Sequence, residues 1–208
     1  MRTIVWDVDD VLNDLTRSWF QQAWLPTHPE TRLQFGDLSE NPPDHLLDVP
    51  RDTYLSSLDA FRLSEMGRTL APNPEVLAWF QHRGTKFRHV ALTATPRSNA
   101  EHAATWVMKH FGDWIRVFGF VPSPRAGETT PVYDCDKSDF LNQFGLCDVF
   151  VDDNPHTVKK ISQMGISCVL APRPWNSERE PLLSALDAAI AGLPASRSSA
   201  FRKESSLR

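Results

Sequence analysis

Residues 3–11 read TIVWDVDDV, and this stretch decides the fold. Its first four residues are β-branched or aromatic and predict a short buried strand over residues 3–6. Three carboxylates, those of Asp7, Asp9 and Asp10, follow this strand at once. In open sheets built from alternating strands and helices, ligands bind at the carboxyl ends of the strands. The stretch therefore predicts a first strand that delivers acidic side chains to a functional site.

Further short apolar runs follow along the chain, each separated from the next by a helical pattern. Asn73-Pro74 and Asn154-Pro155 each place a capping side chain before a proline at the first helical position. Ser98 and Glu101 have the spacing of a capping box, which predicts another helix start. The alternation predicts a parallel sheet with helices on both faces. The predicted strands are residues 3–6, 89–93, 115–120, 148–151 and 166–170.

Residues 13–71 lack this alternation. They begin with an aromatic-rich helical stretch, contain five prolines, and fit short helices near residues 44–47 and 53–61. A segment of roughly 60 residues directly after the first strand is too long for a plain connection, so we expect a cap above the sheet. The predicted division is a core of residues 1–12 and 72–193, a helical cap of residues 13–71, and a flexible, Ser-rich, basic tail of residues 194–208.

The overall charge is −4, from 22 Lys and Arg against 26 Asp and Glu. This balance argues against binding of a nucleic-acid polymer, which needs a basic surface. The apolar runs are too short to span a bilayer, and acidic residues begin too early for a secretory leader, so we expect a cytoplasmic protein with no membrane partner. Three cysteines without CxxC spacing predict reduced thiols rather than disulfides or a zinc site. The oligomeric state stays open.

The ends of the other predicted strands add to the acidic cluster. Thr93 and Ala94 end the second strand, Asp152 and Asp153 end the fourth, and Lys137 begins a short helix between them. Each group alone has an ordinary explanation, such as a solvated turn, a charged helix start or a surface lysine. Together, the neighbouring carboxylates need a cation among them, and all-oxygen ligands suit Mg²⁺. A lysine and a hydroxyl beside that cation supply the donors that a phosphoryl group needs, so the residues predict a phosphoryl site with a carboxylate as nucleophile.

The order of these motifs resembles that of the haloacid dehalogenase superfamily. The matching residues are Asp7-Val-Asp9-Asp-Val11, Ala91-Leu-Thr93, Lys137 and Val149-Phe-Val-Asp152-Asp153, in this order between residues 4 and 153. The inserted segment 13–71 stands where this superfamily carries its smaller cap. Within the superfamily, the chain is most similar to the 5'(3')-deoxyribonucleotidase-type phosphatases, on its first motif and on Pro174-Trp175-Asn176.

The resemblance implies a role for each site residue. Asp7 would attack phosphorus and carry an aspartyl-phosphate, while Asp9 would protonate the leaving oxygen and then activate water. The phosphoryl oxygens would be held by Thr93, the Ala94 amide and Lys137. The ligands of Mg²⁺ would be Asp7, the Asp9 backbone carbonyl, Asp153 and, directly or through water, Asp152.

Asp10 departs from the pattern, since the nucleotidase-like relatives usually have a small residue in its place. Its carboxylate could turn toward the cap, bind a water molecule or lie in solvent, and we count it among the candidate substrate contacts. Arg97 and Arg125 could meet an anionic group of a substrate, although ordinary solvated arginines are the favoured interpretation.

Aromatic residues of the cap offer a further contact to a substrate. Trp19, with its neighbours Phe20 and Trp24, could stack on a flat ring. The favoured interpretation is that this helix packs its aromatic side chains into a small core of its own.

The sequence as a whole predicts an α/β protein with a Rossmann-like three-layer core, a central parallel sheet, and a small, mainly helical cap after the first strand. We expect a cytoplasmic Mg²⁺-dependent phosphatase that acts on a small phosphorylated metabolite, with a deoxynucleoside monophosphate as the leading substrate. Two alternatives stay open: a phosphotransferase that uses the same intermediate, and a non-catalytic phosphate-binding module of the same fold. Asp9 argues against the module, which has no need of an acid or base.

Overall fold

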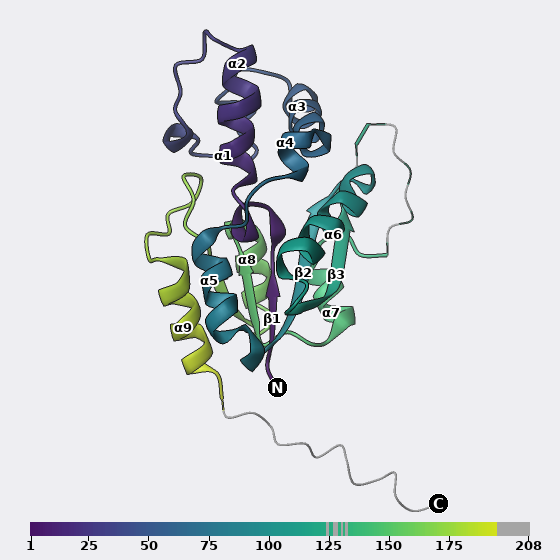
Figure 1. Cartoon of the computed structure of the whole chain (residues 1–208), viewed down its shortest axis with the longest axis vertical. Helices are drawn as coiled ribbons and strands as arrows, with labels where there is room; N and C mark the ends of the chain where they lie inside the picture. Colours follow the sequence, from purple (N-terminus) through teal and green to yellow (C-terminus); the bar gives the residue numbers. More distant parts are fainter. Residues whose placement is uncertain (124, 127–128, 130, 132, 195–208) are drawn as a thin grey trace, which may run out of the picture.

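Five parallel strands form the central sheet of the computed structural model, which describes residues 1–123, 125–126, 129, 131 and 133–194 (Figure 1). Their order is β3-β2-β1-β4-β5, so β1 is flanked on both sides. In the register of the sheet, Ile4 of β1 lies opposite His89 and Val149. The predicted parallel sheet is confirmed. The strands are β1 (Thr3–Trp6), β2 (Arg88–Thr95), β3 (Ile115–Pro122), β4 (Val149–Asp152) and β5 (Ser167–Leu170).

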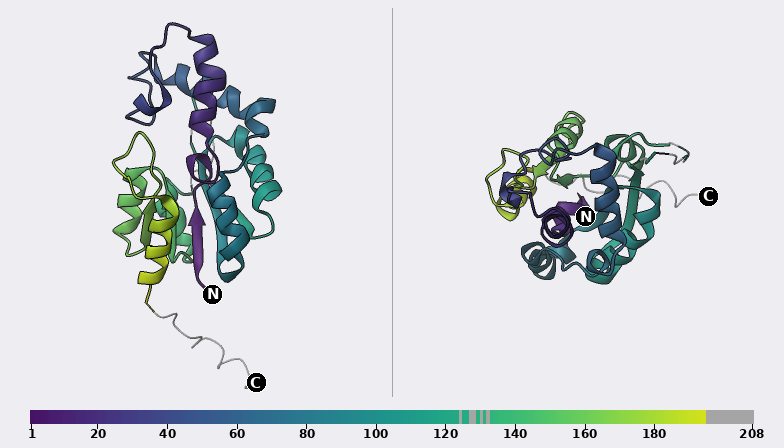
Figure 2. Two further views of the ribbon diagram at one scale, coloured as in Figure 1. Left: turned by 60° about the vertical axis from the view of Figure 1, so that its left-hand side comes forward. Right: turned by 90° about the horizontal axis from the view of Figure 1, so that it is seen from above.

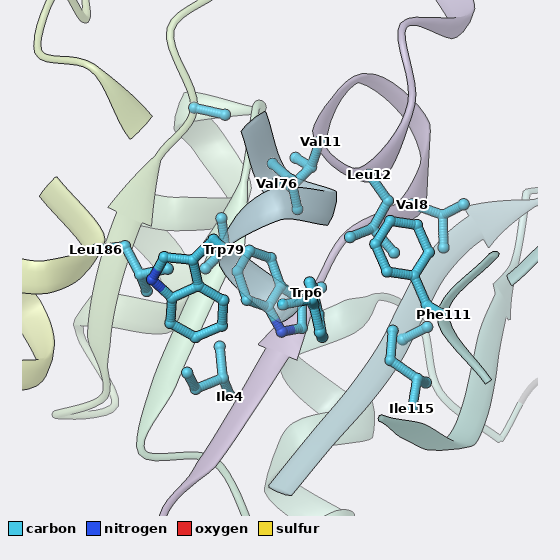
Figure 3. Close-up of a cluster of buried hydrophobic side chains, with 14 of the residues drawn as sticks. Ile4, Trp6, Val8, Val11, Leu12, Val76, Trp79, Phe111, Ile115 and Leu186 are labelled. Carbon is cyan, nitrogen blue, oxygen red and sulfur yellow. The ribbon is translucent and has the colours of Figure 1, made fainter. Parts of the chain in front are cut away.

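Alternate residues of each strand supply the two faces of the sheet. Ile4 and Trp6 belong to a cluster with helices α5 (Pro74–Arg83), α6 (Arg97–Phe111) and α9 (Leu182–Gly192). Figure 3 shows Ile4 and Trp6 of this cluster with Trp79 and Leu186. Val5 points to the opposite face and packs in a second cluster with α7 (Lys137–Phe144) and α8 (Pro155–Ser162). The core therefore has three layers, a sheet between two layers of helices.

A separate hydrophobic cluster forms the centre of the cap. α1 (Leu15–Trp19) continues through a wider turn (Phe20–Trp24) into α2 (Leu25–Thr27), and α3 (Arg51–Leu63) and α4 (Glu65–Arg68) follow. Figure 2 shows these helices above the carboxyl edge of the sheet, as expected for a cap. The members of the cluster are Leu15, Trp19, Phe20, Trp24, Phe35, Leu38, Tyr54, Leu58, Phe61, Leu70 and Trp175.

The two connections between core and cap run side by side. The wide turn Val8–Leu12 leads out of β1, and the Asn73 amide donates to the Leu12 carbonyl at 2.8 Å where the chain returns. Asn13 and Pro72 form an isolated antiparallel bridge at the same place. The chain thus leaves and re-enters the core at one point, directly beside the acidic stretch.

Two local predictions are wrong. Residues 44–47 form turns rather than a helix, because prolines precede them and the chain reverses at Asp48, whose φ is 53°. The capping box at Ser98 does not form, since α6 begins at Arg97 and places Ser98 inside its first turn. Pro96 holds the N-cap position there and makes no side-chain cap.

The predicted flexible tail, residues 194–208, lies outside the described residues except for Pro194. Among the helices of the described ranges, none is both long and apolar enough to cross a bilayer.

Candidate active site

Asp7 continues the line of β1 and lies at the carboxyl edge of the sheet. Its amide donates to the Val151 carbonyl at 2.8 Å, which ties it to β4. Its Oδ1 accepts the Val8 amide at 2.8 Å and lies 2.7 Å from Lys137 Nζ. One carboxylate oxygen is therefore fixed by two donors, and this sets the orientation of the whole side chain.

Asp10 turns toward the cap, one of the three orientations considered for it. Its φ of 62° lies in the left-handed region, which Asp tolerates better than most residues. The Thr16 amide and hydroxyl donate to its two oxygens at 3.0 and 2.5 Å. Burial raises the pKa of Asp10 to about 6, although Arg173 and the Thr16 hydrogen bond lower it. Asp10 thus anchors the start of α1, and it also lines the central cavity.

Lys137 begins α7 and reaches into the cluster of carboxylates. Asp136 caps this helix by accepting the Ser138 and Asp139 amides, which fixes where the Lys137 side chain starts. The Lys137 Nζ lies 2.7 Å from both Asp7 Oδ1 and Asp152 Oδ2. Burial by itself would lower the pKa of Lys137, but the charges of Asp152 and Asp7 outweigh it and raise the pKa above its usual range. The lysine therefore stays charged between two carboxylates.

Asp7, Asp152 and Asp153 form a buried group whose carboxylate oxygens lie within 4.8 Å of one another. Burial raises the pKa of Asp7 to about 7, with Lys137 opposing and Asp152 adding to the rise. Burial, together with the charges of Asp152 and Asp10, raises the pKa of Asp153 well above its usual range. Three buried carboxylates against one lysine leave negative charge uncompensated. This all-oxygen donor set fits a hard divalent cation such as Mg²⁺.

A loop after β5 holds Asp153 in place. Trp175 Nε1 donates to Asp153 Oδ2 at 2.7 Å, and Asn176 Nδ2 donates to the Asp153 carbonyl at 2.9 Å. Both residues belong to the Pro174-Trp175-Asn176 stretch noted in the sequence, although no contact to Asp153 was predicted. Trp175 also belongs to the hydrophobic cluster of the cap, where its ring meets Phe35 edge to face.

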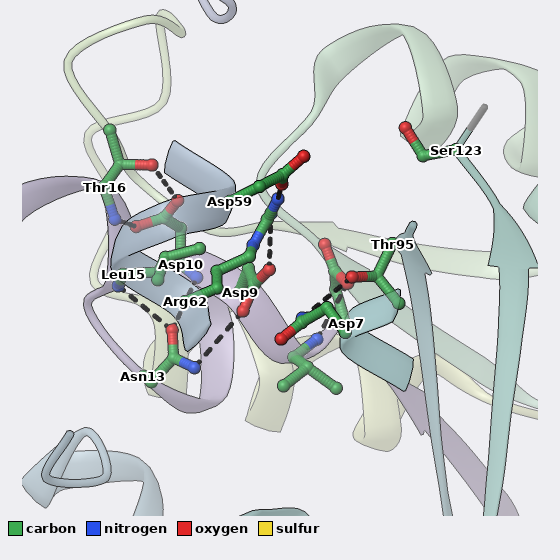
Figure 4. Close-up of polar contacts among 12 residues, drawn as sticks. Asp7, Asp9, Asp10, Asn13, Leu15, Thr16, Asp59, Arg62, Thr95 and Ser123 are labelled. Atoms are coloured by element: carbon green, nitrogen blue, oxygen red, sulfur yellow. Dashed lines mark hydrogen bonds and ion pairs between the residues drawn. The ribbon is translucent and has the colours of Figure 1, made fainter. Parts of the chain in front are cut away.

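Asp9 points to the cap side of the site and meets a cationic side chain that the sequence did not identify. Arg62 Nη2 of α3 lies 2.9 Å from Asp9 Oδ2, and its Nη1 lies 2.9 Å from Asp59 Oδ1 (Figure 4). Arg125 Nε, from the segment after β3, lies 2.5 Å from Asp59 Oδ2. These successive ion pairs therefore connect Asp9 of the core to Arg62 and Asp59 of the cap, and Asp59 in turn to Arg125 of the core. Asp59 and Arg62 are three positions apart in a helix, a spacing so common on solvated surfaces that it carried no signal.

A cavity of about 360 Å³ lies between the sheet edge and the cap. Thr93 and Ala94 at the end of β2 line it, together with all the predicted catalytic and metal-binding residues. From the cap, Leu15, Tyr54 and Leu58 face it. Larger hollows lie elsewhere: one of about 710 Å³ between the cap and the loop after β5, one of about 800 Å³ at the opposite edge of the sheet, and one of about 410 Å³ beside α1 and Pro72.

Two predicted substrate contacts do not reach this cavity. Trp19 is completely buried in the cluster of the cap, where its Nε1 donates to Ser57 Oγ at 3.1 Å. Phe20 and Trp24 are buried beside it, so the favoured interpretation, a small core of the cap's own, describes all three. Arg97 is exposed at the start of α6 and does not line the cavity. The helix packs its aromatic rings inward because that removes the most apolar surface from water.

Comparisons with known proteins assign the fold. No protein-family model and no curated protein sequence matches the chain. A haloacid dehalogenase-like hydrolase from Streptococcus pneumoniae has a similar structure, with a TM-score of 0.57, 11% identity, and coverage of 91% of this chain and 90% of the other. A subfamily IA hydrolase of the same superfamily from Geobacter sulfurreducens has a TM-score of 0.51 and 13% identity, with coverage of 91% of this chain and 96% of the other. A haloacid dehalogenase-like hydrolase from Xanthomonas campestris has a TM-score of 0.53 and 12% identity, with coverage of 92% of this chain and 96% of the other. At these identities the similarity establishes the fold, the one expected from the order of the motifs.

Proposed function

We propose that the chain is a Mg²⁺-dependent phosphatase that hydrolyses a small phosphomonoester through an aspartyl-phosphate on Asp7. The observation that carries this proposal is the Asp7 carboxylate, held by Lys137 at the carboxyl end of β1 and facing the same cavity as Asp9. A phosphate-binding module would need the lysine but would have no use for two carboxylates directed at the ligand.

In the first step, an oxygen of the Asp7 carboxylate attacks phosphorus. The new oxygen–phosphorus bond forms as the bond to the leaving alcohol breaks. Asp9 enters this step in its protonated form, with Arg62 still paired with Asp59, and donates its proton to that alcohol. The Thr93 hydroxyl, the Ala94 amide and the Lys137 ammonium are the donors available to the phosphoryl oxygens. Since burial and two ion pairs hold Lys137 in place, little rearrangement is needed to stabilise the charge that develops.

In the second step, water attacks phosphorus and gives a proton to Asp9, which is now a carboxylate and acts as the base. The bond between phosphorus and Asp7 breaks, so phosphate leaves and the Asp7 carboxylate is restored. Arg62 fixes the position of the Asp9 carboxylate at the cavity wall through its contact of 2.9 Å.

Asp7, Asp152, Asp153 and the Asp9 backbone carbonyl would hold the metal ion. When bound, Mg²⁺ supplies positive charge that offsets the repulsion between the phosphoryl oxygens and the carboxylates. Lys137 supplies the remaining positive charge on the core side of the cavity.

A deoxynucleoside monophosphate is the leading substrate within this class. The resemblance of the first motif and of Pro174-Trp175-Asn176 to deoxyribonucleotidase-type phosphatases favours it, and the side chains of Leu15, Tyr54 and Leu58 offer apolar surface for a base or sugar. We expect the small phosphorylated metabolites of the cytoplasm to be its partners.

Phosphate release from an aryl phosphate tests the proposal. Purified protein should release phosphate only with Mg²⁺ present, and Asp7→Asn should abolish the release. Asp52→Asn, an exposed carboxylate at the start of α3, is the matched control and should keep full activity. Activity that survives Asp7→Asn or a chelator would exclude the mechanism. Phosphate recovered on an added alcohol instead of in solution would identify the phosphotransferase.

A further inference from the structure

Negatively charged side chains outnumber positively charged ones in the lining of the cavity. In the part of the chain that the structure describes, six carboxylates face it but only two cationic side chains do. The cations are Lys137 on the core side and Arg62 on the cap side. The carboxylates are those of Asp7, Asp9, Asp10, Asp136, Asp152 and Asp153.

Lys137 lies at the end of the cavity formed by Asp7 and Asp152, where the phosphoryl group is proposed to react. It lies between Asp7 and Asp152, below the place where the phosphoryl group would bind. A cation in this position neutralises charge on the phosphate itself and offers nothing to the far end of the substrate. Recognition of a second anionic group would therefore depend on the cap side.

Arg62, the cation on the cap side, already has two anionic partners. Its Nη2 pairs with Asp9 and its Nη1 with Asp59, both at 2.9 Å. Burial opposes the charge of Arg62, but Asp9 and Asp59 outweigh it and raise its pKa, so the group is a cation whose charge is already matched. Asp59 also binds Arg125, at 2.5 Å and 3.0 Å.

The other cap side chains around the cavity are neutral. They are Leu15, Thr16, Asn41, Tyr54 and Leu58. Burial raises the pKa of Tyr54 above its usual range, so its phenol keeps its proton. These residues offer apolar surface, hydroxyl groups and an amide, which suit an alcohol with hydroxyl or amide groups of its own.

We propose that the cavity selects phosphomonoesters whose leaving alcohol carries no negative charge, and that the Asp59–Arg62 pair enforces this selection. The inference rests on the proposed function and narrows its substrate class. A second anion at the cap side would lie near Asp9 and Asp10, and among the described residues that line the cavity both cations are already paired with carboxylates. Like charges brought together in a site disfavour binding. Nucleosides and neutral sugars fit this requirement as leaving alcohols, whereas phosphorylated acids and bisphosphates do not.

A pair of substrates of equal size tests the proposal directly. Phosphoglycolate and its amide differ only in a carboxylate against a carboxamide, and each is measured as a competitor of aryl phosphate hydrolysis and as a substrate. We expect kcat/KM, or the inhibition constant where turnover is slow, to favour the amide by at least about tenfold. Equal values, or a preference for the carboxylate, would overturn the inference while leaving the phosphatase intact. Failure to hydrolyse the aryl phosphate would overturn both.

Substitution of Asp59 tests whether the Asp59–Arg62 pair enforces the selection against anionic leaving alcohols. Asp59→Asn removes one anionic partner of Arg62, so the preference for the amide should shrink severalfold in favour of the carboxylate. Asp52→Asn, on the same helix and exposed, should leave the ratio unchanged. Because both compounds are measured on the same sample, a smaller folded fraction cancels from the ratio. An unchanged ratio in Asp59→Asn would show that the pair does not set the selection.

Discussion

Lys137 and Arg62 each hold two carboxylates, on opposite walls of one cavity. Lys137 binds Asp7 and Asp152 on the core side, and Arg62 binds Asp9 and Asp59 on the cap side. A buried carboxylate without a partner is costly, and burial of each cation is tolerated because two carboxylates lie beside it. The same contacts that make this cluster tolerable in the folded chain therefore also fix the two residues proposed to carry the chemistry.

His89 gives the folded core a dependence on pH that is independent of the site. Its ring is 1% exposed, its Nδ1 accepts the Trp6 Nε1 hydrogen at 3.0 Å, and its Nε2 donates to the Gly84 carbonyl at 2.8 Å. Burial lowers its pKa from 6.5 to about 4. Between these values the unfolded chain takes up a proton and the folded chain does not, so acidification lowers the free energy of unfolding.

Unfolding by urea at about pH 7 and about pH 4.5 measures this effect. We expect the wild type to lose about 2 kcal/mol more stability between the two values than His89→Gln, which has no titratable group there. Taking the difference between the two proteins cancels the titration of all other groups. Equal losses in the two proteins would show that His89 is not held neutral in the folded state.

Among the elements, the loop after β5 links the proposed metal ligand Asp153 to the cap. Trp175 donates to Asp153 Oδ2 at 2.7 Å while its ring lies in the hydrophobic cluster of the cap. Groups that orient a metal ligand commonly change the affinity for metal by about 10–100-fold when they are replaced. The loop therefore ties the metal site to the element that covers it.

Replacement of Trp175 tests this link. Trp175→Phe keeps an aromatic ring but removes the donor, so we expect Mg²⁺ binding to weaken by about tenfold. Isothermal titration of Mg²⁺ into the protein measures it without substrate. The matched control is Trp106→Phe, since Trp106 is also buried but donates to the backbone carbonyl of Leu70 and to none of the proposed metal ligands. Identical Mg²⁺ affinity in Trp175→Phe and the wild type would contradict the assigned role.

The elements differ in how far the sequence could predict them. The strands were predictable because their apolar runs and the helix starts between them are local signals, and parallel strands necessarily bring Asp7, Thr93 and Asp152 to one edge. The contacts of Arg62 with Asp9 and of Trp175 with Asp153 were not predictable, since they join residues 53 and 22 positions apart through tertiary packing. The fold and the meeting of these side chains at one edge could thus be predicted, whereas the contacts that orient them could not.

In the molecule as a whole, the cavity lies between the core and the cap. The cap helices lie above the sheet and its helices (Figures 1 and 2). In the proposed mechanism the sheet side supplies the reacting groups, and Leu15, Tyr54 and Leu58 of the cap cluster line the cavity. The chain passes between them at Asn13 and Pro72, and the Asp9–Arg62–Asp59–Arg125 contacts cross the same boundary. The proposed catalytic residues and the proposed selecting residues therefore belong to different parts of the chain.

Mg²⁺ should stabilise the whole fold, and more so at high pH. The raised pKa values of Asp7, about 7, and of Asp153 mean that both carboxyls hold protons in the metal-free fold at low pH. At these two carboxyls the folded chain then binds more protons than the unfolded chain, so their contribution to the stability of the metal-free protein is lost as pH rises from about 4 to about 7. Metal must displace these protons at low pH but not at high pH.

Thermal unfolding with and without Mg²⁺ checks this prediction. At a concentration of about one hundred times Kd, the stabilisation should approach about 2.7 kcal/mol near pH 8 and be smaller near pH 5.5. Asp153→Asn should lose most of this stabilisation by Mg²⁺, whereas Asp52→Asn should keep it. If Mg²⁺ stabilises the protein equally at both pH values, or still stabilises Asp153→Asn, the metal binds elsewhere.

We propose that Asp7 carries the phosphoryl group during turnover, and chemical trapping of that residue tests this proposal. In Asp9→Asn, an aryl phosphate with a good leaving group should still phosphorylate Asp7, while hydrolysis of the intermediate should be slow. Acid quenching, borohydride reduction and peptide mass spectrometry should then find Asp7 converted to homoserine, only when substrate and Mg²⁺ are both present. Unmodified Asp7 during continued phosphate release, or modification of a different residue, would contradict the account.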